Sequence, residues 1–183
     1  MLGTPANPTC RITDVEEVSR LARARGVLVV VAATFGTPRF IRPLDLGADI
    51  SLHSTTKFIN GHGDVVGGIV TTRSELAKTI RKFRTDTGAC PSPMDAFLSL
   101  RGVRTLGLRM ERHNSNALAV AQYLARQPKV SRVYFHGLPE DPGHAIASRQ
   151  MSGFGATFAF DMAGGYEAAK RLLAGIHVMT LAV

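Results

Sequence analysis

A lysine that follows three hydroxyl side chains is the clearest group of potentially reactive residues in the sequence. The segment reads His53-Ser54-Thr55-Thr56-Lys57. Hydroxyl groups can hold an anion such as a phosphate, and a lysine amine attacks aldehydes once burial or neighbouring cations lower its pKa. The pattern therefore predicts an anionic group held beside a reactive amine. Taken alone, it also fits a Ser/Thr-rich turn that carries a solvated lysine.

The residues before this segment predict the elements that position it. Residues 27–31 are consecutive aliphatic residues, mostly β-branched, which is typical of a strand buried on both faces of a parallel sheet. Residues 50–54 read as a second, shorter strand. In open α/β sheets, ligands bind beyond the carboxyl ends of the strands. Lys57 therefore lies where a site is expected.

A helix is expected before the first of these strands. Thr13-Asp14-Val15-Glu16 has the form of a capping box, with Thr13 as the N-cap. Apolar residues then recur at helical spacing, and Gly26 ends the helix. A helix that leads into a buried strand is half of a βαβ unit, so the sequence predicts an α/β fold.

The remaining expected elements continue this alternation. They are strands at 65–71, 130–135 and 156–160, helices at 74–84 and 166–173, and a strand-like run at 177–183. Residues 93–127 favour helix, but Gly102 and Gly107 predict two helices or one bent helix. We expect a domain boundary near residue 105.

Composition narrows the class of protein. Of the 183 residues, 45% are hydrophobic and 20% are charged, which is typical of a soluble globular chain. The longest apolar run is far shorter than the roughly 20 residues of a membrane span, and the first residues do not form a signal peptide. Cys10 and Cys90 lie far apart, which argues against a disulfide framework or a zinc site and favours the cytoplasm.

The net charge of +8 has two interpretations. It could attract an anionic partner, or the cations could be spread over solvated helix faces. The basic residues are distributed over several expected helices, without interleaved aromatic residues or a nucleic-acid motif. We therefore expect no nucleic-acid partner.

Two weaker patterns lie near Lys57. Gly61-x-Gly63-x-x-x-Gly67 only loosely matches a dinucleotide-binding fingerprint, so these glycines are interpreted as tight-turn residues. His53, His62 and Asp64 lack the helical or hairpin spacing of metal ligands, and no metal site is expected.

The lysine segment belongs to a long series of motifs. In chain order they are Asn7-Pro8, Thr34-Phe35-x-Thr37-Pro38, Pro43-Leu44-x-Leu46-Gly47-Ala48-Asp49, His53 to Lys57, Asn60 to Gly68, Ser92-Pro93-x-Asp95-Ala96-Phe97-Leu98, Leu100 to Leu106, Arg109-Met110-x-Arg112-His113, Asn116-Ala117, Gly137-Leu138-Pro139, His144 and Arg149-Gln150-Met151-Ser152-Gly153-x-Gly155. Over nearly the whole chain, this series resembles the Cys/Met metabolism family of pyridoxal-phosphate (PLP) enzymes, which includes cystathionine γ-synthase, cystathionine β- and γ-lyase and methionine γ-lyase.

The resemblance implies a fold and an activity. The fold would be the carboxyl half of a large α/β domain of the aspartate-aminotransferase type, with a mainly parallel sheet, in residues 1–104. Residues 105–183 would hold the linking helix and the start of a small α/β domain. The activity would be trans-sulfuration, by β- or γ-elimination or replacement on cystathionine, homocysteine or an activated homoserine. Family members are tetramers built from dimers.

The resemblance also implies residue roles. Lys57 would bind PLP covalently and shuttle protons, Ser54 and Thr56 would bind its phosphate, and Asn7 would lie near its 3-hydroxyl. The family has an Asp-Asn pair where this chain has Ala32-Ala33. That aspartate keeps the ring nitrogen of the cofactor protonated, which makes PLP an electron sink. Ala32 therefore predicts impaired carbanion chemistry.

Both ends of the sequence predict a fragment. Residues 4–8 read as an interior loop with no strand before them, and residues 178–183 end within a strand-like run. The resemblance implies a preceding segment whose aromatic residue stacks on the cofactor, and a following segment whose arginine binds the substrate carboxylate. We therefore expect impaired activity. The alternatives are a non-catalytic remnant or scaffold of the family and a basic anion-binding module.

Overall fold

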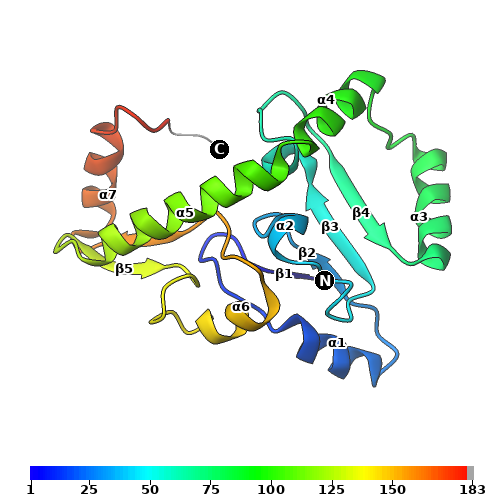
Figure 1. Cartoon of the computed structure of the whole chain (residues 1–183), viewed down its shortest axis with the longest axis horizontal. Helices are drawn as coiled ribbons and strands as arrows, with labels where there is room; N and C mark the ends of the chain where they lie inside the picture. The colour runs from blue at the N-terminus through cyan, green and yellow to red at the C-terminus, as the bar shows by residue number, and fades with distance from the viewer. Residues whose placement is uncertain (181–183) are drawn as a thin grey trace.

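The computed structural model describes residues 1–180, and within them a four-stranded sheet forms the framework of the N-terminal part. Its strands are β1 (Leu2–Gly3), β2 (Val30–Ala32), β3 (Ile50–Ser54) and β4 (Gly68–Thr72), in the order β1-β2-β3-β4. The first three strands are parallel and β4 is antiparallel to β3, as Figure 1 shows. The expected α/β fold with a mainly parallel sheet is confirmed.

Strand boundaries differ from those expected, except for 50–54. The strand expected at 27–31 begins only at Val30, because the amide of Val27 bonds to the carbonyl of Ala22 and closes the preceding helix. Residues 65–67 precede β4 because the carbonyl of Gly67 accepts hydrogen bonds from Thr55 and Thr56. The expectation that no strand precedes residue 4 was wrong, since β1 pairs with β2.

Helix α1 (Val15–Arg23) begins one residue later than expected. Its N-cap is Asp14, whose carboxylate accepts from the amide of Glu17 at 3.1 Å, so the prediction of Thr13 was wrong. The carbonyl of Thr13 instead accepts from the side chain of Gln150 at 2.9 Å. The side-chain oxygen of Gln150 also accepts from the amide of Val15 at 3.1 Å, which caps α1 from a distant part of the chain.

Gln150 ends a helix that the sequence did not predict, α6 (His144–Gln150). The other elements are α2 (Thr37–Phe40), α3 (Ser74–Thr87), α4 (Pro93–Val103), α5 (Leu106–Ala125), β5 (Val130–Tyr134), β6 (Ala159–Met162) and α7 (Gly165–Ala174). The break between α4 and α5 confirms two helices in 93–127. Strands β5 and β6 form an antiparallel pair against α5 and α7. Residues 177–180 form no strand, and 181–183 lie outside the described residues.

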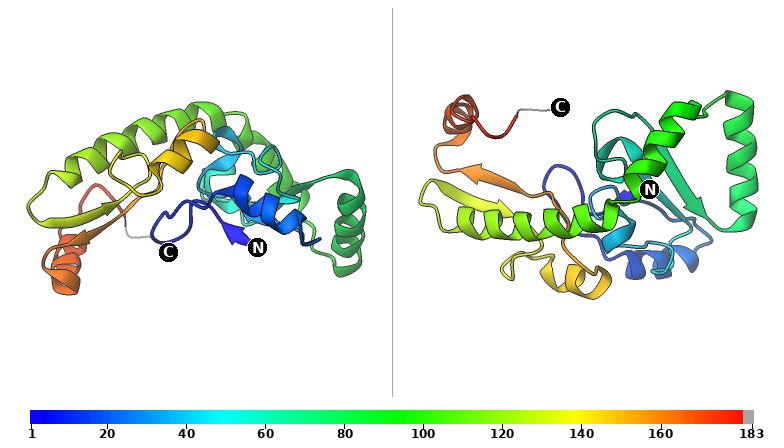
Figure 2. Two further views of the ribbon diagram at one scale, coloured as in Figure 1. Left: turned by 90° about the horizontal axis from the view of Figure 1, so that it is seen from below. Right: turned by 45° about the horizontal axis from the view of Figure 1, so that its top comes forward.

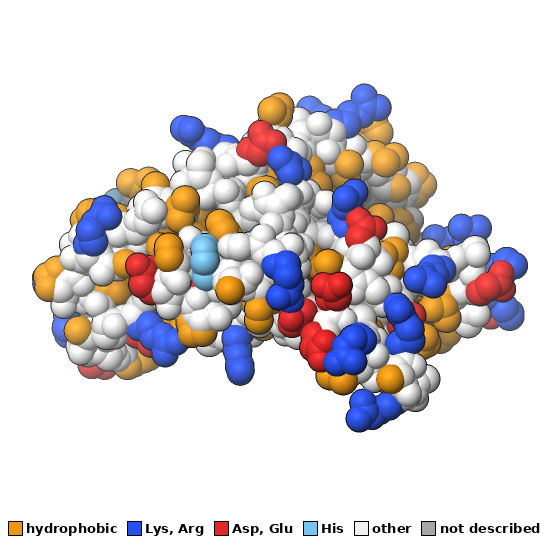
Figure 3. Space-filling view, turned by 60° about the horizontal axis from the view of Figure 1, so that its bottom comes forward, with side chains coloured by type: hydrophobic (Ala, Val, Ile, Leu, Met, Phe, Trp, Pro, Cys, Tyr) orange, Lys and Arg blue, Asp and Glu red, His pale blue; other side chains and the backbone are white. Residues whose placement is uncertain are grey.

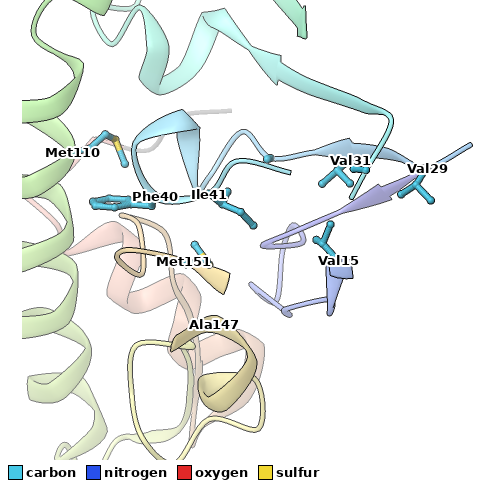
Figure 4. Close-up of a cluster of buried hydrophobic side chains, with 10 residues drawn as sticks. Val15, Val29, Val31, Phe40, Ile41, Met110, Ala147 and Met151 are labelled. Carbon is cyan, nitrogen blue, oxygen red and sulfur yellow. The ribbon is translucent and has the colours of Figure 1, made fainter. Parts of the chain in front are cut away.

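A shared apolar core joins distant parts of the chain. Val15 of α1 and Val31 of β2 pack in one cluster with Met110 of α5 and Met151, which follows α6 (Figure 4). A second cluster, containing Phe135 and Ala121, lies under α5. Side chains from both sides of residue 105 fill the first cluster, and the expected domain boundary there stays a prediction.

The molecule is elongated and curved. Figure 2 shows α3 at one end, α7 at the other, and the long helix α5 between them. On the face in Figure 3, Lys and Arg side chains are scattered among Asp and Glu. No helix within residues 1–180 is long and apolar enough to cross a membrane.

Candidate active site

Three strand ends meet at one edge of the sheet. Gly3 pairs with Ala32, and Ala32 pairs with Leu52. Beyond the strands, the amide of Thr4 bonds to the carbonyl of Ala32 at 3.1 Å, and that of Ala33 bonds to the carbonyl of Leu52 at 2.9 Å. Because β1, β2 and β3 are parallel, the segments that follow them leave from the same edge, which is where open α/β sheets hold ligands.

Lys57 lies in a kinked helical turn that begins as β3 ends. This turn, η1 (Thr55–Ile59), has π-helical hydrogen bonding, and Lys57 itself is non-helical, with φ −92° and ψ −123°. Just before the turn, the amide of Ser54 donates a hydrogen bond to the hydroxyl of Thr34 at 3.0 Å. The Lys57 side chain is exposed and free to meet a ligand. Single π-helical turns of this kind often occur at functional sites.

Gly67 holds one side of the turn. Its carbonyl accepts from the amides of Thr55 at 2.9 Å and Thr56 at 3.4 Å. Its amide donates to the Thr56 hydroxyl at 2.9 Å. A Cβ at position 67 would lie 2.7 Å from the Thr55 hydroxyl, so a larger residue there would require Thr55 to move. Sequence reasoning assigned Gly67 to a turn without recognising its contact with the lysine segment.

Arg109 contacts the end of the lysine turn opposite to Gly67. The sequence placed Arg109 in a motif but did not predict this contact. Its guanidinium donates to the carbonyls of Phe58, Ile59 and Gly102. The residue follows Lys57 by about fifty positions, so only the tertiary structure brings the two segments together.

The expected cofactor residues divide into two groups. Ser54, Thr56 and Lys57 lie together at the end of β3. Asn7 is exposed in the loop after β1, and Ala32 is half-buried at the end of β2. The parallel strands end at one edge of the sheet, but no hydrogen bond in the described residues links the side chain of Asn7 to those of the other four.

The nearby histidines and Asp64 contact other protein groups. His53 is buried, and its Nε2 lies 3.1 Å from the hydroxyl of Ser51. Burial lowers the pKa of His53, so its imidazole is neutral at pH 7. His62 bonds to the Asn60 carbonyl, and Asp64 to the Asn60 side chain. Within residues 1–180, no group of three or more His, Cys, Asp or Glu side chains has metal-binding geometry.

The two cysteines differ in exposure. Cys10 is buried, and burial followed by the charge of Asp141 raises the pKa of its thiol to about 11. At pH 7 the thiol is therefore protonated and a poor nucleophile. Cys90 is exposed. Cys10 is thus no candidate for covalent chemistry, whereas Lys57 is exposed beside three hydroxyl side chains.

The side chains present fit part of PLP. The hydroxyl of Ser54 has no hydrogen-bond partner among residues 1–180 and can donate to a phosphate, whereas that of Thr56 is bonded to Gly67 and would have to exchange a partner. The exposed Lys57 amine suits the aldehyde. The methyl group of Ala32 cannot pair with a protonated ring nitrogen, and this part of the site does not fit.

Comparisons with known proteins match one family along the chain. The model of the family described as Cys/Met metabolism PLP-dependent enzyme matches residues 1–183. An L-methionine gamma-lyase of Fusobacterium nucleatum subsp. polymorphum is 49% identical over 185 residues, covering 100% of this chain and 47% of the relative. A cystathionine gamma-synthase of Mycobacterium leprae is 49% identical over 180 residues, covering 98% and 46%.

Solved structures give the same picture. The crystal structure of cystathionine gamma synthase from Xanthomonas oryzae pv. oryzae in complex with cystathionine superposes with a TM-score of 0.97 at 48% identity. This match covers 100% of this chain and 47% of the solved one. The chain therefore spans about half the length of the curated relatives and solved structures that it matches.

Proposed function

Because the chain belongs to the Cys/Met metabolism family of PLP-dependent enzymes, we propose that it binds PLP covalently through Lys57. The observation that carries this proposal is the kinked turn at the carboxyl edge of the sheet, where an exposed lysine follows the hydroxyl of Ser54. When bound, PLP supplies an electron sink for bonds at the substrate α-carbon.

The proposed roles follow from the chemistry of each side chain. The Ser54 hydroxyl would donate to the phosphate, and Thr56 would join it by giving up the bond that its hydroxyl donates to the carbonyl of Gly67. The Asn7 amide donates to the phenolic oxygen. When it does not hold the cofactor, the Lys57 amine would take and return a proton at the substrate α-carbon as a general base.

We further propose the reaction class and partners of the whole protein. These are trans-sulfuration on a small amino acid such as cystathionine, homocysteine or an activated homoserine, in a homotetramer built from dimers. The relatives named methionine gamma-lyase and cystathionine gamma-synthase support this class. A cytoplasmic location is part of the same proposal, since both cysteines are free thiols.

A second candidate is a non-catalytic remnant or scaffold of the family, and Ala32 favours it. Without a carboxylate at this position, a bound pyridine ring stays largely neutral and withdraws electrons poorly. Such a chain would bind PLP at Lys57 without turning over an amino acid.

Borohydride labelling tests the lysine assignment. With PLP present, reduction followed by peptide mapping should place the cofactor mainly on Lys57. Lys78 and Lys82, which form exposed ion pairs on α3, serve as internal controls. Lys57→Arg should remove the label, and Ser54→Ala should weaken PLP binding by about tenfold, as the loss of a hydrogen bond to a charged group predicts. Equal labelling of all three lysines would contradict the proposal.

A further inference from the structure

Arg109 binds the backbone on both sides of a junction near Lys57. From the first turn of α5, its Nη1 donates to the carbonyl of Phe58 at 2.7 Å, and its Nη2 donates to that of Ile59 at 3.1 Å. Nη2 also donates to the carbonyl of Gly102 at 2.8 Å, and Nε to the hydroxyl of Thr105 at 3.0 Å. The side chain thereby binds the carbonyls of Phe58 and Ile59 at the end of η1 and joins them to the carbonyl of Gly102 near the end of α4, which also accepts from Thr105.

The surrounding residues leave room for this arrangement. Gly61 has a φ of +76°, and a Cβ there would lie 2.1 Å from Nη1 of Arg109. A Cβ at Gly102 would lie 2.3 Å from the carbonyl oxygen of Asn60, which is backbone and cannot rotate away. Gly61 and Gly102 therefore let the segment after Lys57 lie close to the junction of α4 and α5. At this distance, the guanidinium of Arg109 reaches carbonyls of both segments.

We propose that Arg109 is a positioning residue for Lys57, an inference that rests on the proposed function. Gly67 fixes the start of the lysine turn, and Arg109 fixes its end by holding the carbonyls of Phe58 and Ile59. With both ends held, the backbone at Lys57 keeps its kinked conformation and so sets the position of the amine. Arg109 acts through this backbone, without touching the cofactor.

The geometry requires arginine and not merely a positive charge. A guanidinium presents several donors in a rigid plane, whereas a lysine ammonium is a single point on a flexible stem. Arg109→Lys keeps the charge but cannot reach all three carbonyls together. Arg109→Ala removes both the positive charge and the planar set of donors. Arg112→Ala is the matched control, since this arginine is one turn further along α5, exposed, and without a side-chain hydrogen bond in the described residues.

Hydrogen exchange on the full chain without cofactor tests the structural part. The amides of Asn60 and Gly61 bond to the carbonyls of Thr55 and Lys57, and so report on η1. In Arg109→Ala they should exchange about ten- to a hundredfold faster, as expected for buried acceptors left unpaired, while amides of the β2–β3 ladder change less. Arg109→Lys should lie between Arg109→Ala and the unchanged chain, and Arg112→Ala should have no effect.

The rate and pH profile of borohydride labelling at Lys57 test the positioning part. In Arg109→Ala and Arg109→Lys, Lys57 should be labelled at least about tenfold more slowly, and the pH midpoint of labelling should shift. The reason is that misplacing a reactive group by about 1 Å can lower a reaction rate about a hundredfold. Arg109→Lys keeps the test decisive if Arg109→Ala does not fold.

The outcomes separate the two proposals. If the unchanged chain does not label Lys57, the proposed function is wrong, and exchange at Asn60 and Gly61 still decides whether Arg109 holds the turn. If the chain labels Lys57 and both variants label it at the same rate and pH, the positioning role is wrong and the function stands. An equal rise in exchange at all amides would also overturn the inference, since it would show only a general loss of stability.

Discussion

Ala32 is the last residue of β2, and Lys57 follows the neighbouring strand β3. Only Lys57 carries a reactive group. Lys57 can bind an aldehyde, whereas the methyl group of Ala32 offers nothing to a pyridine nitrogen. Removing the partner of a buried charge typically costs about 3–5 kcal/mol, which corresponds to roughly two to three and a half decades in rate. A single side chain therefore separates cofactor binding from turnover in this proposal.

Ala32→Asp should restore the chemistry. In the chain joined to the flanking segments of one of its relatives, this change should raise exchange of the substrate α-proton in heavy water by at least about two decades. Adding Lys57→Ala should abolish the exchange. If Ala32→Asp leaves exchange unchanged while PLP is bound, position 32 does not face the ring nitrogen.

At the scale of elements, helices α4 and α5 each contain a glycine with different surroundings. The glycine of α4 packs against the lysine turn, and the glycine of α5 has open space beside it. Gly102 of α4 lies against the backbone of Asn60, but a Cβ at Gly107 of α5 would meet nothing within 4 Å. The same substitution at these two positions therefore separates the effect of crowding from that of helix propensity.

Gly102→Ala should lower the free energy of unfolding by about 1–3 kcal/mol, because α4 must move away from Asn60. Gly107→Ala should raise it by about 0.5–1 kcal/mol, because alanine favours the helix and meets no obstacle. Urea unfolding followed by circular dichroism measures both. Equal effects of the two changes would show that α4 does not pack against η1 as described.

The elements found correctly from sequence are those with strong local signals. Residues 50–54 were predicted with the observed strand limits, and glycines marked the two-helix region of 93–127. Strand β1 is too short to show a periodicity, and α6 spans only seven residues, to which no element was assigned from the sequence. The cap of α1 was misplaced because Thr13 is held by Gln150, a long-range partner.

The candidate site follows the same rule. Ser54, Thr56 and Lys57 could be found because they lie within four residues of each other after a strand. Gly67 and Arg109 could not be connected to them, because their contacts form between segments far apart in the sequence. The roles of Asn7, Ser54, Thr56 and Lys57 toward PLP stay predictions.

At the scale of the whole molecule, the curved shape leaves large apolar side chains exposed on α3 and α4. Phe83 is 69% exposed, Phe97 60% and Leu100 68%. Where such side chains gather into one patch, they usually mark an interaction site. Strand β4, which lies beside these helices, is also exposed along most of its length.

We expect the purified chain to self-associate through this surface. Sedimentation velocity should show an apparent mass that rises with protein concentration. The double change Phe97→Glu and Leu100→Glu should reduce association without lowering the free energy of unfolding by more than about 0.5 kcal/mol, because both side chains are exposed. A compact monomer at all concentrations would contradict this prediction.

The distant cap of α1 has a consequence for the time at which the chain can fold during synthesis. Gln150 follows its partner Val15 by 135 residues. At about 5–20 residues per second, a ribosome makes the second residue roughly 7–27 s after the first. Until then, a nine-residue helix such as α1 is too short to be stable alone. Helix α1 is therefore secured only after α6 has been made, and until then Val15 and its apolar neighbours lack part of their native cover.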